Sequence, residues 1–220
     1  MKKFLAYVPV FLIAMLVTSC DKEDNYVFPD LITEMSCLKT NSKGYGTQII
    51  TDEGLIWHLQ EGNRPSKLTP DSIYRVISRY APITTSDAPQ AEAKAYSFYS
   101  TISPIPLPES NYQTIKTDPV SIQSIWRSGD YLNLILQIKV KDQKHELSFI
   151  DNGITTHEDG TKTLTLTLFH DRKNDTEGFD EKSYLSVPLW YYQDKLSEGD
   201  QIVFQLNTYK EGMTSRSFTY

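Results

Sequence analysis

Four histidines carry the side chains best suited to metal or acid–base chemistry: His58, His145, His157 and His170. A metal site needs two or more converging ligands, and neither the spacing HxH nor HxxxH occurs in the chain. His145 and His170 fall in the apolar phase of two predicted strands, so they could meet on adjacent strands, although a histidine satisfied at a core edge is the commoner arrangement. His157 stands between two predicted strands, before Glu-Asp-Gly, which indicates a polar hairpin tip. We therefore predict no metal site.

The segment 171–181, with the sequence DRKNDTEGFDE, is the most acidic part of the chain. Its carboxylates surround a glycine, and hard oxygen ligands of this kind suit calcium. The EF-hand spacing D-x-[DN]-x-[DN]-G is absent, however, and Arg172 and Lys173 offset the negative charge. We therefore interpret the segment as a long, solvated hairpin loop, with calcium binding as the alternative.

Nucleophilic and nucleotide chemistry lack their motifs in this chain. No G-x-S-x-G elbow, no G-x-G-x-x-G fingerprint and no P-loop occurs. Cys37 shares its strand phase with Leu31 and Met35, which predicts a small buried hydrophobic residue rather than a reactive thiol, and no base lies near it in the sequence. We therefore expect no catalytic residue, no cofactor and no enzyme activity.

Residues 1–20 indicate one covalent modification, on Cys20. A pair of lysines precedes an apolar run from Phe4 to Val17, a length of roughly 14 residues against the ~20 that a membrane-spanning helix needs. A secretory signal peptide over 1–19 is therefore favoured over a transmembrane helix. The ending Val-Thr-Ser-Cys resembles a bacterial lipoprotein signal, which implies cleavage before Cys20 and attachment of lipid, palmitate included, to that cysteine.

Residues 20–29 form a predicted acidic tether between the lipid and the fold. Three acidic residues occur in the four positions after the cysteine, and this cluster resembles the surface-export signal of lipoproteins in anaerobic Gram-negative bacteria. A plain solvated spacer is the alternative. We expect a lipid-anchored protein of the outer membrane that faces the cell exterior, with the periplasmic face as the alternative.

The charge of the chain limits its partners. Its formal net charge is −6, and removal of residues 1–19 takes away two lysines and no acidic residue, which brings the charge to −8. A nucleic-acid partner requires a basic surface, so we exclude that class. Electrostatic adhesion to anionic lipid is disfavoured for the same reason.

The first half of the chain, residues 30–111, has the pattern of a small β domain. Five short strands are predicted, at 31–38, 47–51, 55–59, 72–80 and 93–102, and Asp52-Glu53-Gly54 marks a hairpin turn. Five strands within about 80 residues fit a barrel of the OB type. Segment 104–111 begins with proline at every second position, which predicts stiff, extended chain and a domain boundary near residue 112.

The second half, residues 112–220, has the clearest alternation. One predicted strand places five apolar side chains on one face: Leu132, Leu134, Leu136, Ile138 and Val140. Further strands are predicted at 145–150, 164–168, 184–189, 202–206 and 217–220. Because no segment shows a helical period of useful length, this half is predicted to be an antiparallel β-sandwich, and the whole fold is predicted to be all-β.

Five short pieces of the chain resemble the NigD-like lipoproteins, and they occur in this order: PDLITE (29–34), ITDEG (50–54), LTPDSIYRV (68–76), IWRSGDYLN (125–133) and YLSVPL (184–189). The resemblance implies an N-terminal OB-type domain and a C-terminal β-sandwich. The family's founding member resembles an immunity protein encoded beside a bacteriocin. No catalytic residues are associated with the family, so none is implied here.

Aromatic side chains that face outward are the remaining candidates for a binding site: Trp126, Trp190, Tyr191 and Tyr192. Such rings can stack on sugars or anchor a protein partner, and burial in the core is the alternative. Two hypotheses follow. The first is a non-enzymatic envelope lipoprotein that binds a protein partner, with a role in bacteriocin immunity. The second is a glycan-binding accessory lipoprotein of the cell surface.

Overall fold

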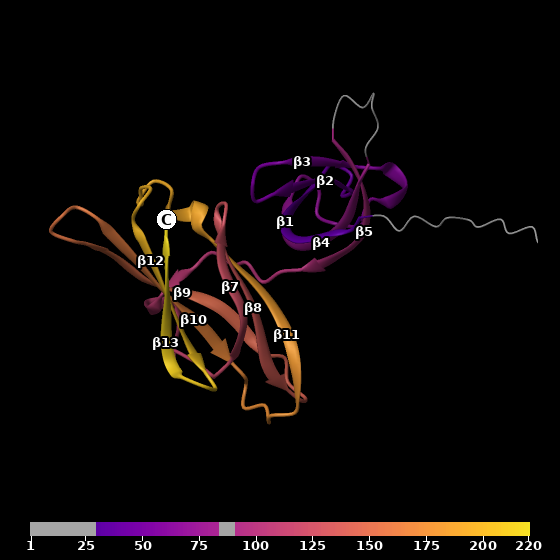
Figure 1. The fold of residues 1–220 in the computed structure, drawn as a ribbon. Helices are drawn as coiled ribbons and strands as arrows, with labels where there is room; N and C mark the ends of the chain where they lie inside the picture. Colours follow the sequence, from indigo (N-terminus) through magenta and orange to yellow (C-terminus); the bar gives the residue numbers. More distant parts are fainter. Residues whose placement is uncertain (1–29, 84–90) are drawn as a thin grey trace, which may run out of the picture.

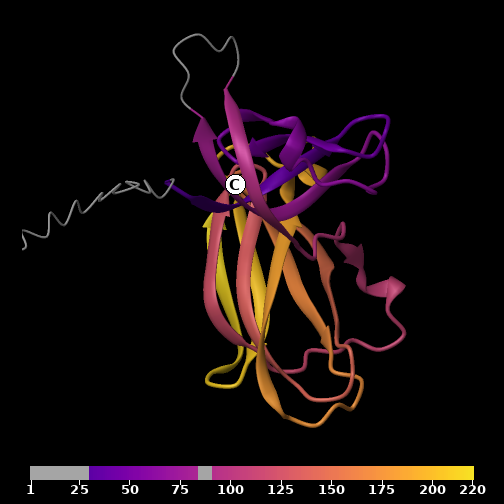
Figure 2. The same cartoon turned by 90° about the vertical axis from the view of Figure 1, so that its right-hand side faces the viewer.

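The computed structural model describes residues 30–83 and 91–220, and their regular structure is almost entirely β-strand. The chain forms two domains, a barrel that lies against one end of a sandwich (Figures 1 and 2). None of the described helices is long and apolar enough to cross a membrane. The predicted signal peptide, the acidic tether and Cys20 lie outside the described residues.

The N-terminal domain is a closed barrel with the strand order β1-β2-β3-β5-β4. Its elements are β1 (Ile32–Thr40), β2 (Gly46–Thr51), β3 (Ile56–Leu59), the 3-10 helix η1 (Glu61–Asn63), β4 (Ile73–Ile83) and β5 (Glu92–Ser100). Strand alternation turns Leu38 of β1 and Val76 and Tyr80 of β4 into the barrel core. The OB-type barrel predicted from the sequence is confirmed. The side chains between these inward positions point out of the barrel, and this places Cys37 and Arg75 on its outer surface.

The C-terminal domain is a sandwich of a five-stranded sheet, β13-β12-β10-β9-β6, and a three-stranded sheet, β11-β8-β7. Its strands are β6 (Leu107–Pro108), β7 (Ser121–Ser128), β8 (Tyr131–Val140), β9 (Glu146–Thr156), β10 (Lys162–Asp171), β11 (Phe179–Pro188), β12 (Gln201–Thr208) and β13 (Gly212–Thr219), and its 3-10 helices are η2 (Glu109–Asn111) and η3 (Leu189–Tyr192). The leucines predicted to share one face of β8 are buried between the sheets. The all-β prediction is therefore confirmed.

Two details of the sandwich differ from the predicted antiparallel arrangement. β10 and β12 pair in parallel, because β11 between them in sequence crosses to the other sheet. β7 was not predicted as a strand. It is an edge strand whose residues are mostly half-buried without alternation, so its sequence carries no period of two.

The chain leaves the barrel N-terminal to the proline-rich segment. Ile102 exchanges backbone hydrogen bonds with Tyr184 and Ser186 of β11, so it already belongs to the sandwich. The segment then continues as β6, which lies at the edge of the five-stranded sheet, beside β9. Alternating prolines cannot join a central strand, but they can lie along a sheet edge. The crossing therefore lies at residues 101–102, whereas we had expected a boundary near 112.

Candidate binding cleft between the barrel and the sandwich

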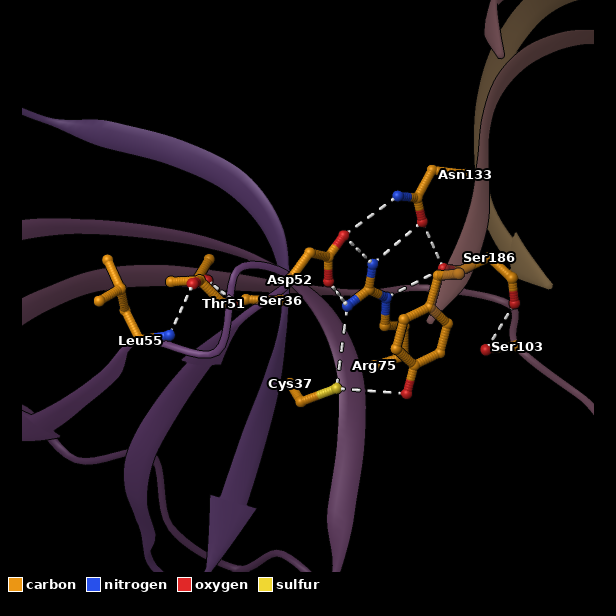
Figure 3. A network of polar contacts seen from close by, with 11 residues as sticks. Ser36, Cys37, Thr51, Asp52, Leu55, Arg75, Ser103, Asn133 and Ser186 are labelled. Carbon is orange, nitrogen blue, oxygen red and sulfur yellow. Dashed lines mark hydrogen bonds and ion pairs between the residues drawn. The ribbon is translucent and has the colours of Figure 1, made fainter. Parts of the chain in front are cut away.

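A buried ion pair between Asp52 and Arg75 lies where the sandwich meets the barrel (Figure 3). The Arg75 guanidinium donates from Nη1 to Asp52 Oδ1 at 2.6 Å and from Nη2 to Oδ2 at 2.9 Å, a bidentate geometry. The two side chains are only 3% and 6% exposed. Burial by itself lowers the pKa of Arg75, but the hydrogen bond and the charge of Asp52 outweigh it and raise that pKa. The Arg75 guanidinium is therefore held in its charged form.

Two polar side chains of the sandwich complete this network. Asn133 of β8 accepts a hydrogen bond from Arg75 Nη2 at 3.0 Å, and Ser186 of β11 accepts one from Nε at 2.9 Å. The Ser186 hydroxyl donates to Asn133, and the Asn133 amide donates to Asp52 Oδ2 at 3.3 Å. Asn133 and Ser186 are completely buried. Because each buried group has a partner, the network specifies one docked arrangement of the two domains.

Two hairpin tips touch beside the network. Asp52 begins the turn between β2 and β3, and Gly129 lies in the turn between β7 and β8. Gly129 has a φ of +52°, and a Cβ at this position would lie 2.4 Å from the carbonyl oxygen of Asp52. Only glycine permits both this backbone conformation and this approach. The close contact fixes the distance between the two domains.

Tyr131 and Cys37 extend the network toward solvent. The Arg75 guanidinium carbon lies 3.8 Å from the centre of the Tyr131 ring, which is a cation–π contact. The Tyr131 hydroxyl lies 3.4 Å from Cys37 Sγ. Burial first, and then the hydrogen bond with Cys37, raise the pKa of Tyr131. The prediction that Cys37 is a buried core residue was wrong: its side chain points out of the barrel and is half-buried at the domain boundary.

An open cleft of ≈ 640 Å³ lies between the domains around this network. Ile73 of β4 lines its barrel side, and Trp190 of η3 lines its sandwich side. Ile73 is 63% exposed and Trp190 is 41% exposed, so both offer apolar surface to the cleft. Thr101, at the crossing between the domains, and Asp130, beside Gly129, also line the cleft. The volume falls within the range of about 300 to 1,000 Å³ that is typical of ligand-binding pockets.

The four predicted binding aromatics separate in the structure. Trp190 and Tyr191 are exposed, at 41% each, and Trp190 lines the cleft. Trp126 is half-buried on β7. The prediction that Tyr192 is exposed was wrong, because it packs in the sandwich core and its hydroxyl donates to Asp151 at 3.0 Å. The 3-10 turn η3 explains the difference, because it points adjacent side chains in different directions.

His145, one residue before β9, meets His170 of the neighbouring strand β10, close to the first of our alternatives. His145 Nδ1 lies 2.9 Å from His170 Nε2, and His170 Nδ1 lies 2.9 Å from the carbonyl oxygen of Asp118. A carbonyl oxygen only accepts, so His170 Nδ1 carries a proton and its Nε2 accepts from His145. His145 Nε2 lies 3.3 Å from a carboxylate oxygen of Asp175. His145 Nδ1 therefore donates to His170 Nε2, and His145 Nε2 faces the carboxylate of Asp175.

Asp175, in the acidic segment, is buried and is held by the chain between Lys141 and His145. Its carboxylate accepts hydrogen bonds from the backbone N–H groups of Lys141 and Asp142, at 2.7 and 3.1 Å. Burial alone would raise the pKa of Asp175, but these bonds and the one from His145 outweigh it and lower the pKa to about 2. Within residues 30–83 and 91–220, no cluster of three or more His, Cys, Asp or Glu side chains is suited to a metal ion.

Sequence reasoning did not find the interdomain network. Asn133, Arg75 and Ser186 carry no motif of their own in the sequence. One signal was nevertheless present, because Asp52, Arg75, Asn133 and Ser186 all lie within the short pieces that carry the family resemblance. The resemblance implies the two domains but not the contacts between them.

The barrel, the sandwich and their fixed docking define a class of two-domain β protein with a cleft between an OB-type barrel and a β-sandwich. Residues 103–220 match the NigD-like C-terminal beta sandwich domain, which is more than half of the chain. The chain therefore belongs to the NigD-like family.

Solved structures agree with this assignment. A NigD-like immunity protein from Bacteroides caccae is 29% identical, and the match covers 89% of this chain and 99% of that one with a TM-score of 0.67. A protein of unknown function from Bacteroides vulgatus is 18% identical, with coverage of 86% and 90% and a TM-score of 0.68. A candidate lipoprotein from Bacteroides fragilis is 13% identical, with coverage of 87% and 97% and a TM-score of 0.54. The last two similarities concern the fold alone. No curated protein matches the chain.

Proposed function

We propose that this chain is a non-catalytic lipoprotein, anchored through Cys20 to the outer membrane, that binds a protein partner in the cleft between its two domains. The observation that carries the proposal is the open cleft of ≈ 640 Å³, held between two docked domains and lined by exposed apolar side chains. Large exposed apolar groups beside a concave surface favour a binding role. The buried ion-pair network keeps the cleft in one shape, which lowers the cost of ordering it when the partner binds.

The partner we favour is a secreted toxin, which would make the protein an immunity factor. The support is the description of the Bacteroides caccae relative as a NigD-like immunity protein. An anchor at the cell envelope would hold the cleft where such a toxin arrives. Lipidation of Cys20 and export to the outer face of the outer membrane belong to the same proposal.

The test is deletion of the gene in the host bacterium, followed by killing curves with the secreted bacteriocins of neighbouring strains. We expect the deletion strain to be killed at lower toxin doses, and we expect the wild-type gene to restore resistance. Complementation with Trp190→Ala should fail. Phe179→Ala should succeed, because this exposed aromatic lies at the far end of β11 from the cleft. Unchanged killing of the deletion strain would refute the immunity role.

A glycan ligand is the second candidate, because Trp190 and Tyr191 are exposed next to each other on η3. Adjacent exposed rings can stack on sugar faces. Calorimetry of the purified protein against a broad panel of oligosaccharides tests this role. Binding that disappears in Trp190→Ala would support it, and absence of binding across the panel would remove it.

A further inference from the structure

Thr101 places in the cleft a buried hydroxyl that no described residue satisfies. Thr101 lines the cleft and is 8% exposed, and its hydroxyl oxygen is buried with no hydrogen-bond partner among the described residues. Buried polar atoms nearly always have a partner, so rotation of this side chain toward the cleft would let a ligand group supply one. A backbone carbonyl or N–H of a bound segment would satisfy it.

The other buried polar groups of the cleft are already engaged within the protein. Asp52 and Arg75 bind each other, and the Ser103 hydroxyl donates to the Ser186 carbonyl at 2.6 Å. Large apolar surface remains available on both sides, from Ile73 and Trp190. A sugar carries many hydroxyl groups that need partners, whereas a peptide segment carries few beyond its backbone. The cleft therefore favours a peptide segment over a sugar.

The charge of the cleft is negative once its ion pair is set aside. Asp130 lines the cleft, is exposed, and forms no ion pair with any residue that the structure describes. Glu53 is exposed on the same turn as Asp52. Asp130 is therefore the unpaired charge among the described residues that line the cleft. A cationic group on the partner would complement it.

We propose that the cleft binds an extended segment of a partner protein in which an apolar side chain stands next to a lysine or arginine. The apolar side chain packs between Ile73 and Trp190, the basic side chain pairs with Asp130, and a backbone group of the segment hydrogen-bonds to Thr101. This inference rests on the proposed function and specifies the chemistry of its partner.

The test is selection of a random heptapeptide library, displayed on phage, against the purified protein, followed by titration of the selected sequences as fluorescent synthetic peptides. We expect enriched sequences to contain a basic residue beside Leu, Ile or Phe. Trp190→Ala should lower the affinity for the peptide about tenfold or more. Thr101→Val should lower it several-fold, and Asp130→Asn about two- to fivefold at low salt. The matched controls are Phe179→Ala, Thr155→Val and Glu158→Gln, all exposed and outside the cleft, and they should bind as the wild type does.

The outcomes separate this inference from the proposed function. Enrichment of acidic or uncharged peptides that still require Trp190 would overturn the predicted partner chemistry and leave the binding role of the cleft intact. Binding that no cleft variant affects, or no enrichment at all, would overturn both. Binding of sugars instead of peptides would overturn the proposed partner and support a glycan ligand for the cleft.

Discussion

Replacement of Arg75 by methionine should release the barrel from the sandwich rather than unfold either domain. Asp52 and Arg75 both belong to the barrel, whereas the groups that cover them, Asn133 and Ser186, belong to the sandwich. In Arg75→Met the Asp52 carboxylate keeps only the Asn133 amide, at 3.3 Å, among its side-chain donors. Docking would then bury an almost uncompensated charge.

The size of this penalty follows from the burial of the pair. Removing one partner of a buried ion pair typically costs about 3–5 kcal/mol, which is a factor of roughly 10² to several 10³ in the docking equilibrium. The domains can avoid the full cost by separating, because separation returns Asp52 to water. The free energy of unfolding of each domain should therefore change less than the docking equilibrium does.

The assay is small-angle scattering of the purified protein together with limited proteolysis at the crossing between the domains, residues 100–102. Arg75→Met should expand the protein and expose that segment to cleavage. Asp52→Asn should have a smaller effect, because Arg75 keeps Ser186, Asn133 and the ring of Tyr131. The double variant should dock better than Arg75→Met alone, because no charge is then buried. Arg79→Met, an exposed arginine on the same strand, is the control. Unchanged scattering and proteolysis in Arg75→Met would refute the reasoning.

Three further predictions test the remaining features. Gly129→Ala should weaken docking by more than the ~1 kcal/mol of left-handed backbone strain, because its Cβ would meet the Asp52 carbonyl at 2.4 Å. The control is Gly153→Ala, with φ +98° and open space around it, which should show the strain alone in urea unfolding. Equal losses of stability in the two variants would argue against the contact. Burial, as the largest cause, lowers the pKa of His170 below its ordinary 6.5, so the unfolded chain binds a proton that the folded one does not, and stability should fall as pH drops below about 6.5. Melting temperatures from pH 7.5 to 5 should show a shallower slope for His170→Gln than for wild type or His157→Gln, and equal slopes would contradict this. Cys20→Ser should abolish incorporation of labelled palmitate and release the protein from the membrane fraction, whereas Cys37→Ser should do neither.

The sequence was sufficient for the architecture because burial in a β domain repeats every second residue. β8 shows this best, since its leucines carried the prediction and are buried as expected. Cys37 shows the limit of the argument, because a shared phase indicates which side chains face the same way but not which face is the core. The surface of the barrel that bears Cys37 is covered by the sandwich, and coverage by another domain leaves no period in the sequence. The meeting of His145 and His170 could be proposed from their phase, but Asp175, which completes that cluster, came from a loop we had interpreted as solvated.

The location of the interdomain network gives the family resemblance a physical meaning. Four of the five resembling pieces hold Asp52, Arg75, Gly129 with Asn133, and Ser186, and these pieces come from four separate regions of the chain. Core leucines can be exchanged for other apolar residues at modest cost, but a bidentate ion pair capped by two neutral side chains and a glycine contact tolerates few substitutions. What the pieces share is therefore the docking of two β domains at one fixed geometry. The cleft exists only in that geometry, so the residues that dock the two domains also shape the proposed binding site that Ile73, Thr101, Asp130 and Trp190 line.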